Sequence, residues 1–165
     1  MKKNEQLKIA VFVSGGGTNL QALIDAQKDG VIRHGALSLV VSNNPDAYAL
    51  TRAANAGIST AVLSKKDCPT QEEFEEKLVA LLEENGIELI VLAGFMRILS
   101  EKFTSRYPKR ILNVHPSLIP SFCGKGFYGL HVHEAALEKG VKVSGATVHI
   151  VTPECDAGPD RKSVV

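Results

Sequence analysis

The chain has 165 residues, of which 44% are hydrophobic and 22% charged, and its formal net charge is +1 at pH 7. This length suits a single domain with a substantial core, and the lysines and arginines are scattered, unlike the basic face of a nucleic-acid-binding protein. The three cysteines form no C-x-x-C pair, so we expect the reduced thiols of a cytoplasmic protein and no metal site.

The N-terminal segment 1–17 contains an apolar run of only about five residues before its glycines, which is too short for a signal-peptide core or a membrane span. We therefore expect neither a membrane partner nor a nucleic-acid partner, and the sequence leaves homodimer formation open.

Apolar, β-branched segments alternate with amphipathic ones along the chain, which predicts a doubly wound α/β fold with a mainly parallel sheet. In such sheets ligands bind beyond the carboxyl ends of the strands, so chemistry is expected directly after each strand. In chain order, the predicted elements are strand 8–13, helix 20–30, strand 36–43, helix 45–57, strand 59–64, a helix between Thr70 and Gly86, strand 87–94, strand 110–114, helix 131–140 and strand 144–151.

The glycine-rich stretch SGGGTN, residues 14–19, follows the first predicted strand and precedes a helix. Glycines let backbone N–H groups approach an anion, and a helix N-terminus favours negative charge. The dinucleotide pattern G-x-G-x-x-G fails because Leu20 stands where its third glycine belongs. The stretch is therefore either a single-phosphate site or a tight turn.

Asn113 and His115 lie two positions apart at the end of a predicted strand, so both side chains project from the same face. An amide donor beside an imidazole can stabilise an oxyanion and supply a proton. The alternative is that both side chains satisfy buried backbone groups. Asp156, in a loop after the last strand, would favour the protonated form of His115 if it reached that side chain, or would otherwise support its own turn.

The other histidines and the segment 93–99 point less clearly to a particular kind of site. His131 and His133 are two apart at a helix start and diverge, and His149 lies in the middle of a strand, so no metal is expected. In the segment AGFMRIL, residues 93–99, the apolar side chains are either core or a pocket wall. Arg97 either holds a carboxylate or caps a neighbouring helix.

Four stretches taken together resemble the folate-dependent glycinamide ribonucleotide formyltransferases: VSGGGTNLQALID, VLAGFMRILS, LNVHPSLIPSF and GATVHIVTPECDAGP. The resemblance covers residues 7 to 159 and implies a Rossmann-like formyltransferase fold. It also implies transfer of a formyl group from 10-formyltetrahydrofolate to glycinamide ribonucleotide in purine biosynthesis, without metal. The residues implied are Asn113, His115 and Asp156 for catalysis, Gly17, Thr18 and Asn19 for the substrate phosphate, and Met96, Arg97, Ile98 and Leu99 with Asn113 for the folate.

The resemblance ends at DAGP, residues 156–159. The family continues with another apolar strand and a helical segment, whereas this sequence gives DRKSVV. We therefore expect a single domain over 1–165 that lacks the family's C-terminal strand and helix, and weak or absent activity from the chain as it stands.

Three alternatives to this function are considered. A methionyl-tRNA formyltransferase would carry a tRNA-binding domain and a more basic surface. A formyltetrahydrofolate deformylase would carry an N-terminal regulatory domain. A non-catalytic phosphate-binding module would tolerate replacement of His115 without any change in a reaction rate.

Overall fold

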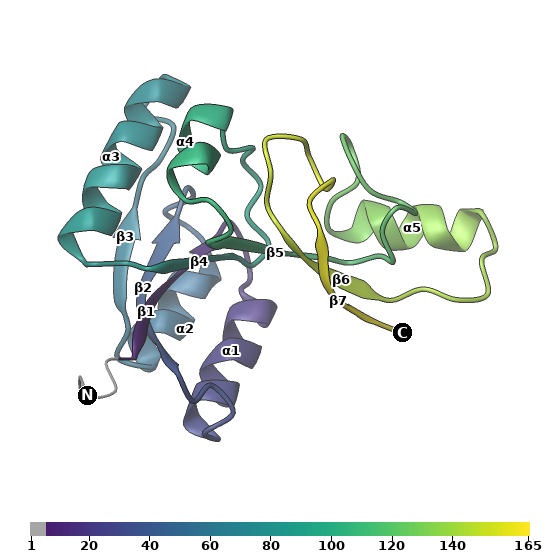
Figure 1. Cartoon of the computed structure of the whole chain (residues 1–165), viewed down its shortest axis with the longest axis horizontal. Coiled ribbons are helices and arrows are strands. Elements are labelled where there is room, and N and C mark those ends of the chain that lie inside the picture. The colour runs from purple at the N-terminus through teal and green to yellow at the C-terminus, as the bar shows by residue number, and fades with distance from the viewer. Residues whose placement is uncertain (1–5) are drawn as a thin grey trace. The chain divides into compact units, whose positions relative to one another are not determined.

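The computed structural model describes residues 6–165, so the expectation for the N-terminal segment falls partly outside the described residues. The chain forms two compact units, one ending at Arg97 and the other beginning at Ile98, and each is described by itself (Figure 1). The expectation of a single domain stays a prediction. Within residues 6–165 no helix combines the length and apolar character needed to cross a membrane.

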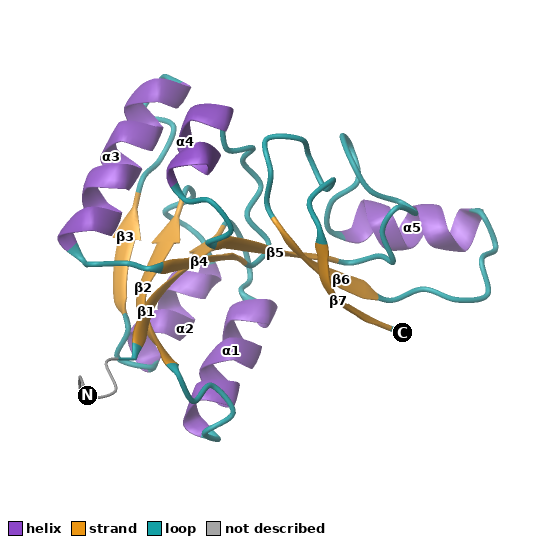
Figure 2. Ribbon diagram, viewed as in Figure 1, coloured by secondary structure: helices purple, strands orange, loops and turns teal. Residues whose placement is uncertain are grey.

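The described part of the first unit is a parallel sheet in the strand order β3-β2-β1-β4, with helices on both faces (Figure 2). The chain moves outward from β1 to β3 and then returns to β4. With right-handed crossovers this reversal places α1 and α2 on one face and α3 on the other. The elements are β1 (Leu7–Val13), α1 (Thr18–Lys28), β2 (Gly35–Ser42), α2 (Tyr48–Asn55), β3 (Ser59–Val62), α3 (Gln71–Glu84) and β4 (Leu89–Leu92).

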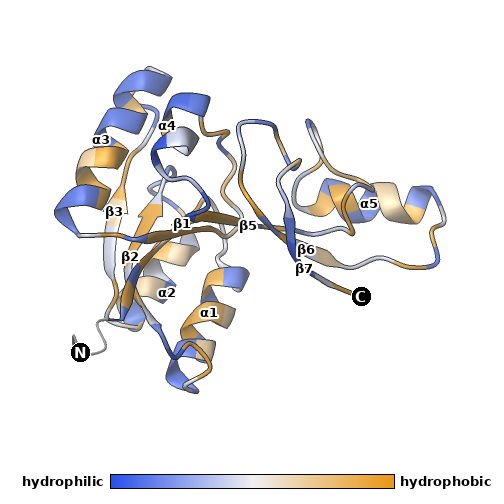
Figure 3. Cartoon of the chain, in the orientation of Figure 1, coloured by the Kyte–Doolittle hydropathy of each residue, from blue (hydrophilic) through white to orange (hydrophobic). Residues whose placement is uncertain are grey.

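The core of this unit lies on both sides of β1, because alternate side chains of that strand point to opposite faces. Val11 and Val13 pack in a cluster with Leu20 of α1 and Ala53 of α2. On the opposite face, the Phe12 ring lies 5.5 Å from that of Phe95, which stacks on Phe74 of α3 at 6.4 Å. Figure 3 shows β1 and β2 as largely apolar, and residues 9–13 of β1 are all buried, as expected for a strand covered on both faces.

The helices α3 and α1 begin in different ways. At the start of α3 the Thr70 hydroxyl accepts the Glu73 N–H at 3.2 Å, and the Glu73 carboxylate accepts the Thr70 N–H, which forms a capping box. The N-cap of α1 is Gly17, which makes no side-chain bond and adopts left-handed angles of φ 73° and ψ 33°.

The second unit contains β5 (Ile111–His115), β6 (Ala146–Ile150) and β7 (Asp160–Val164), together with α4 (Glu101–Arg106) and α5 (Leu130–Glu138). Here β6 pairs antiparallel with both β5 and β7, so the parallel pattern of the first unit does not extend to these strands. The antiparallel register sets Asn113 opposite His149 and His115 opposite Thr147.

Two elements of this unit were not predicted. Helix α4 is short and begins at Ser100, whose hydroxyl accepts the Phe103 N–H at 3.2 Å. Strand β7 forms within DRKSVV, where no strand was expected. All five of its residues are exposed, and it appears largely polar in Figure 3. The sequence of β7 has no apolar alternation that would mark a strand, so the main-chain pairing with β6 defines β7.

Candidate active site

The glycine loop of the first unit presents a left-handed turn directly before α1. Gly17 requires glycine, since a Cβ at this position would lie 2.6 Å from the Cβ of Ala49 and its φ is 73°. A Cβ on Gly15 or Gly16 would meet nothing within 4 Å, so the loop surface around them is open. An open, glycine-lined surface before a helix N-terminus is able to accept a phosphate.

Thr18 and Asn19, the other predicted phosphate ligands, are exposed in the first turn of α1. The structure therefore places the three predicted phosphate residues, Gly17, Thr18 and Asn19, side by side at one helix N-terminus.

Ser14 joins the glycine loop to the segment after β4, a link that the sequence analysis missed. Its hydroxyl donates to Asn43 Oδ1 at 2.6 Å and accepts the Met96 N–H at 2.8 Å. Parallel strands bring their carboxyl ends to the same edge of a sheet, so β1, β2 and β4 place these residues together. The expectation that chemistry lies directly after each strand was enough to suggest this contact.

The predicted folate segment divides into exposed and buried residues. Met96 and Ile98 are exposed, while Leu99 is buried and belongs to a core. Arg97 donates from Nε to Gln71 Oε1 at 2.8 Å, and its guanidinium lies 3.9 Å from the centroid of the Phe74 ring. The side chain of Arg97 is thus held against α3.

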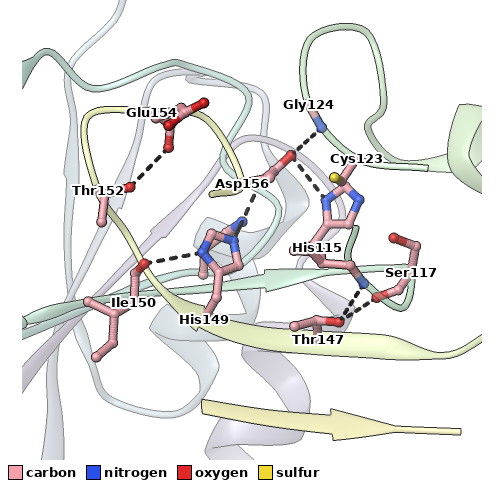
Figure 4. Close-up of polar contacts among 12 residues, drawn as sticks. His115, Ser117, Cys123, Gly124, Thr147, His149, Ile150, Thr152, Glu154 and Asp156 are labelled. Carbon is pink, nitrogen blue, oxygen red and sulfur yellow. Dashed lines mark hydrogen bonds and ion pairs between the residues drawn. The ribbon is translucent and has the colours of Figure 1, made fainter. Parts of the chain in front are cut away.

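The second unit brings the three predicted catalytic side chains together. Asn113 and His115 are alternate residues of β5, and Asp156 reaches His115 and His149 from the loop between β6 and β7 (Figure 4). Asn113 joins the cluster through His149. The Asp156 carboxylate places Oδ2 3.7 Å from His115 Nδ1 and Oδ1 3.5 Å from His149 Nε2. The Gly124 N–H donates to the same Oδ2 at 2.9 Å.

Asp156 remains ionised in this setting. Its side chain is only 9% exposed, and burial by itself would raise the pKa of its carboxyl. The hydrogen bond from His149, the bond from the Gly124 N–H and the charges of His115 and His149 outweigh burial and hold the pKa below the ordinary 3.8. The carboxylate is therefore a fixed negative charge beside two imidazoles.

His115 is buried between two acceptors. Its Nε2 lies 2.8 Å from the Phe122 carbonyl oxygen, which can only accept, so Nε2 carries a proton. Its Nδ1 faces the Asp156 carboxylate, and the distance from Nδ1 to Oδ2 is 3.7 Å, which is longer than a hydrogen bond. Nδ1 therefore makes no hydrogen bond to this carboxylate.

His149 is the functional candidate that sequence reasoning dismissed as a mid-strand residue. It is buried, and its Nε2 lies 3.1 Å from Asn113 Nδ2 as well as 3.5 Å from Asp156 Oδ1. A ring nitrogen carries either a proton or a lone pair, so Nε2 serves one of these partners at a time. The sequence analysis could have found His149 by pairing the predicted strands 110–114 and 144–151 in antiparallel orientation, because that pairing sets His149 opposite Asn113.

The turn after His115 is fixed by buried hydroxyl groups. Thr147 donates to the Ser117 carbonyl at 2.7 Å and accepts the Ile119 N–H at 3.1 Å.

The three cysteines, Cys68, Cys123 and Cys155, are all free thiols. Burial, followed by the charge of Asp156, raises the pKa of the Cys123 and Cys155 thiols, so both resist ionisation.

The cluster therefore combines a proton donor, an amide and a permanent carboxylate, which suits stabilisation of a tetrahedral intermediate in acyl transfer. Among residues 6–165, no group of three or more His, Cys, Asp or Glu side chains is arranged to hold a metal ion.

Comparison with protein families gives a match to the formyl transferase model over residues 7–160. Phosphoribosylglycinamide formyltransferase of Escherichia coli is 44% identical over 153 residues, which cover 93% of this chain and 69% of that protein. The trifunctional purine biosynthetic protein adenosine-3 of Gallus gallus is 45% identical over 94% of this chain, which spans only 15% of that longer protein.

Solved structures give the same result. Glycinamide ribonucleotide transformylase 1 from Symbiobacterium toebii superposes with a TM-score of 0.88 at 40% identity, covering 96% of this chain and 72% of that one. Formyltetrahydrofolate deformylase from Burkholderia mallei superposes with a TM-score of 0.82 at 29% identity, covering 98% of this chain and 54% of that one. These likenesses confirm the predicted doubly wound α/β fold.

Proposed function

We propose that this chain, which belongs to the formyl transferase family and within it to the phosphoribosylglycinamide formyltransferases, transfers a formyl group from 10-formyltetrahydrofolate to the amine of glycinamide ribonucleotide. The observation that carries the proposal is the contact of Asp156 with His115, because it places a carboxylate beside the imidazole that would act as the acid. The higher identity to the formyltransferases, 44% against 29% for the deformylase structure, favours an amine over water as the acceptor.

The reaction begins with attack of the glycinamide nitrogen on the formyl carbon. A new C–N bond forms, and the carbonyl π electrons move to oxygen to give a tetrahedral oxyanion. The intermediate then collapses, the bond from carbon to N10 breaks, and N10 leaves with a proton while the amine loses one. The products are formylglycinamide ribonucleotide and tetrahydrofolate, so atoms and charge balance without metal or redox chemistry.

The residues of the second unit fit these charge changes. The His115 imidazolium would stabilise the oxyanion and deliver a proton to the departing N10. The Asn113 amide would donate a second hydrogen bond to the oxyanion. Asp156 would keep His115 charged and oriented, with its own carboxylate fixed by the Gly124 N–H.

The residues of the first unit fit substrate binding. Gly17, Thr18 and Asn19 would hold the ribose phosphate through backbone N–H groups and side-chain donors at the start of α1. Met96 and Arg97 would contact the folate. Ile98, the first residue of the second unit, is exposed. Leu99 is buried, so its part in this binding is to anchor the segment. We assign the protein a cytoplasmic location and small-molecule substrates.

A single-turnover assay tests the proposal, with the chain in excess over glycinamide ribonucleotide so that even slow transfer is detected. Mass spectrometry of the products should show formylglycinamide ribonucleotide appearing as 10-formyltetrahydrofolate is consumed. Consumption that does not depend on glycinamide ribonucleotide would instead identify a deformylase. Binding of glycinamide ribonucleotide without any product would identify a non-catalytic phosphate-binding module.

A further inference from the structure

We propose that Arg52, on the second helix, is a positioning residue for the phosphate site. It fixes the peptide between Gly16 and Gly17, so that the Gly17 N–H is presented to the phosphate. This inference rests on the proposed function, which supplies the phosphate-bearing substrate, and it adds a residue outside the loop that binds it.

Helix α2 contacts two successive carbonyl groups of the glycine loop. The Ala49 N–H donates to the Gly15 oxygen at 3.1 Å, and the Arg52 Nε–H donates to the Gly16 oxygen at 2.8 Å. In a trans peptide the C=O and the following N–H point in opposite directions. The N–H groups of Gly16 and Gly17 therefore point away from α2. Consecutive N–H groups turned to one side form an anion-binding concavity.

The space around the loop agrees with this orientation. On the α2 side Gly17 is in close contact, since any Cβ there would collide with Ala49. Gly15 and Gly16 face open space within 4 Å of their would-be Cβ positions. The loop thus has one side packed on α2 and another open to a ligand, and the carbonyl bonds to α2 decide which polar groups face the open side.

Arg52 is itself held in place by neighbouring residues. Its Nη1 donates to Gln21 Oε1 of α1 at 3.1 Å, and its guanidinium carbon lies 5.0 Å from the centroid of the Tyr48 ring. The planar guanidinium makes its bonds to Gly16 and Gln21 at the same time, which a lysine ammonium does not reproduce in the same fixed geometry. The residue also places a permanent positive charge beside the loop.

The test compares Arg52→Met and Arg52→Lys with the unaltered chain, and Arg33→Met serves as the control because Arg33 is an exposed arginine of the same unit outside the loop. Calorimetric titration measures binding of glycinamide ribonucleotide, and steady-state kinetics measure KM for each substrate. For Arg52→Met we expect glycinamide ribonucleotide to bind about tenfold more weakly, because the variant loses the charge-assisted hydrogen bond to the Gly16 oxygen. KM for the folate and the melting temperature should stay near those of the unaltered chain.

Arg52→Lys should recover only part of the affinity, since it restores the charge without the paired bonds, and Arg33→Met should bind as the unaltered chain does. Equal affinity in Arg52→Met and the unaltered chain would overturn the inference while leaving the proposed function standing. A parallel rise in both KM values with a lower melting temperature would also overturn it, since that is the result of a purely structural role. Absence of binding by the unaltered chain would overturn the proposed function itself and the inference with it.

Discussion

Replacing Asp156 by Asn removes one charge from the proposed catalytic cluster while keeping its shape. The amide oxygen of the Asn side chain can still accept the Gly124 N–H, so the hydrogen bond that holds the loop is retained. The variant therefore separates the charge of Asp156 from its role in loop structure. The imidazolium form of His115 loses its counter-ion, and the protonated acid becomes less favourable.

The size of the effect follows from the distance between the two groups. At 3.7 Å and an effective dielectric constant of about 20, the attraction between imidazolium and carboxylate is about 4.5 kcal/mol. Part of this attraction offsets the desolvation of the buried carboxylate. A net loss of about 2 to 4 kcal/mol corresponds to a fall in kcat of about 30- to 1,000-fold.

The assay follows the absorbance change of a 10-formyl-folate analogue at saturating glycinamide ribonucleotide. Glu154→Gln is the matched control, because it makes the same carboxylate-to-amide change two residues away. Glu154 is exposed, and it accepts the Thr152 hydroxyl through its backbone carbonyl, which the substitution keeps. We expect the control to retain the kcat of the unaltered chain. A kcat for Asp156→Asn within threefold of that of the unaltered chain would refute the charge argument, as would an equal loss in both variants.

Three further predictions concern the same side chains and the glycine loop. His149→Phe should lower kcat by about tenfold or more, because Asp156 and Asn113 both lose a buried partner, and His149→Gln should recover part of this rate; equal rates for all three proteins would exclude a role for His149. Because the folded-state pKa of Asp156 lies below 3.8, its contribution to stability is present above that pH and is lost as the pH falls through the folded pKa. Urea unfolding should therefore show the unaltered chain losing stability relative to Asp156→Asn over that acid range, and parallel pH profiles would contradict the low pKa. Gly17→Ala should destabilise the fold by about 1 to 3 kcal/mol in the same assay, owing to its positive φ and the contact with Ala49, and an unchanged midpoint would show that the loop adapts.

Much of the first unit could be predicted from the sequence because its signals are local. Apolar runs such as 8–13 and 87–94 mark strands covered on both faces, and Thr70 with Glu73 marks a helix start. Asn113 and His115 were identified because their two-residue spacing at the end of a strand is also a local feature.

The unpredicted features of the second unit depend on pairing between segments distant in sequence. The strand formed by residues 160–164 has a polar, fully exposed sequence, so only its pairing with β6 defines it. His149 reaches Asp156 and Asn113 because β6 runs antiparallel to β5, and the sequence of neither strand indicates this direction. Arg52 lies 35 to 36 residues after the glycines whose peptide it holds, so its contact with Gly16 required the folded structure.

The most direct test of formyl transfer by this cluster is His115→Ala, measured for both binding and turnover in the same preparation. We expect glycinamide ribonucleotide still to bind in calorimetric titration, because His115 is not one of the proposed phosphate-binding residues, while formyl transfer is lost. Turnover by His115→Ala at the rate of the unaltered chain would contradict the account, because the chemistry would then not depend on the imidazole at the end of β5.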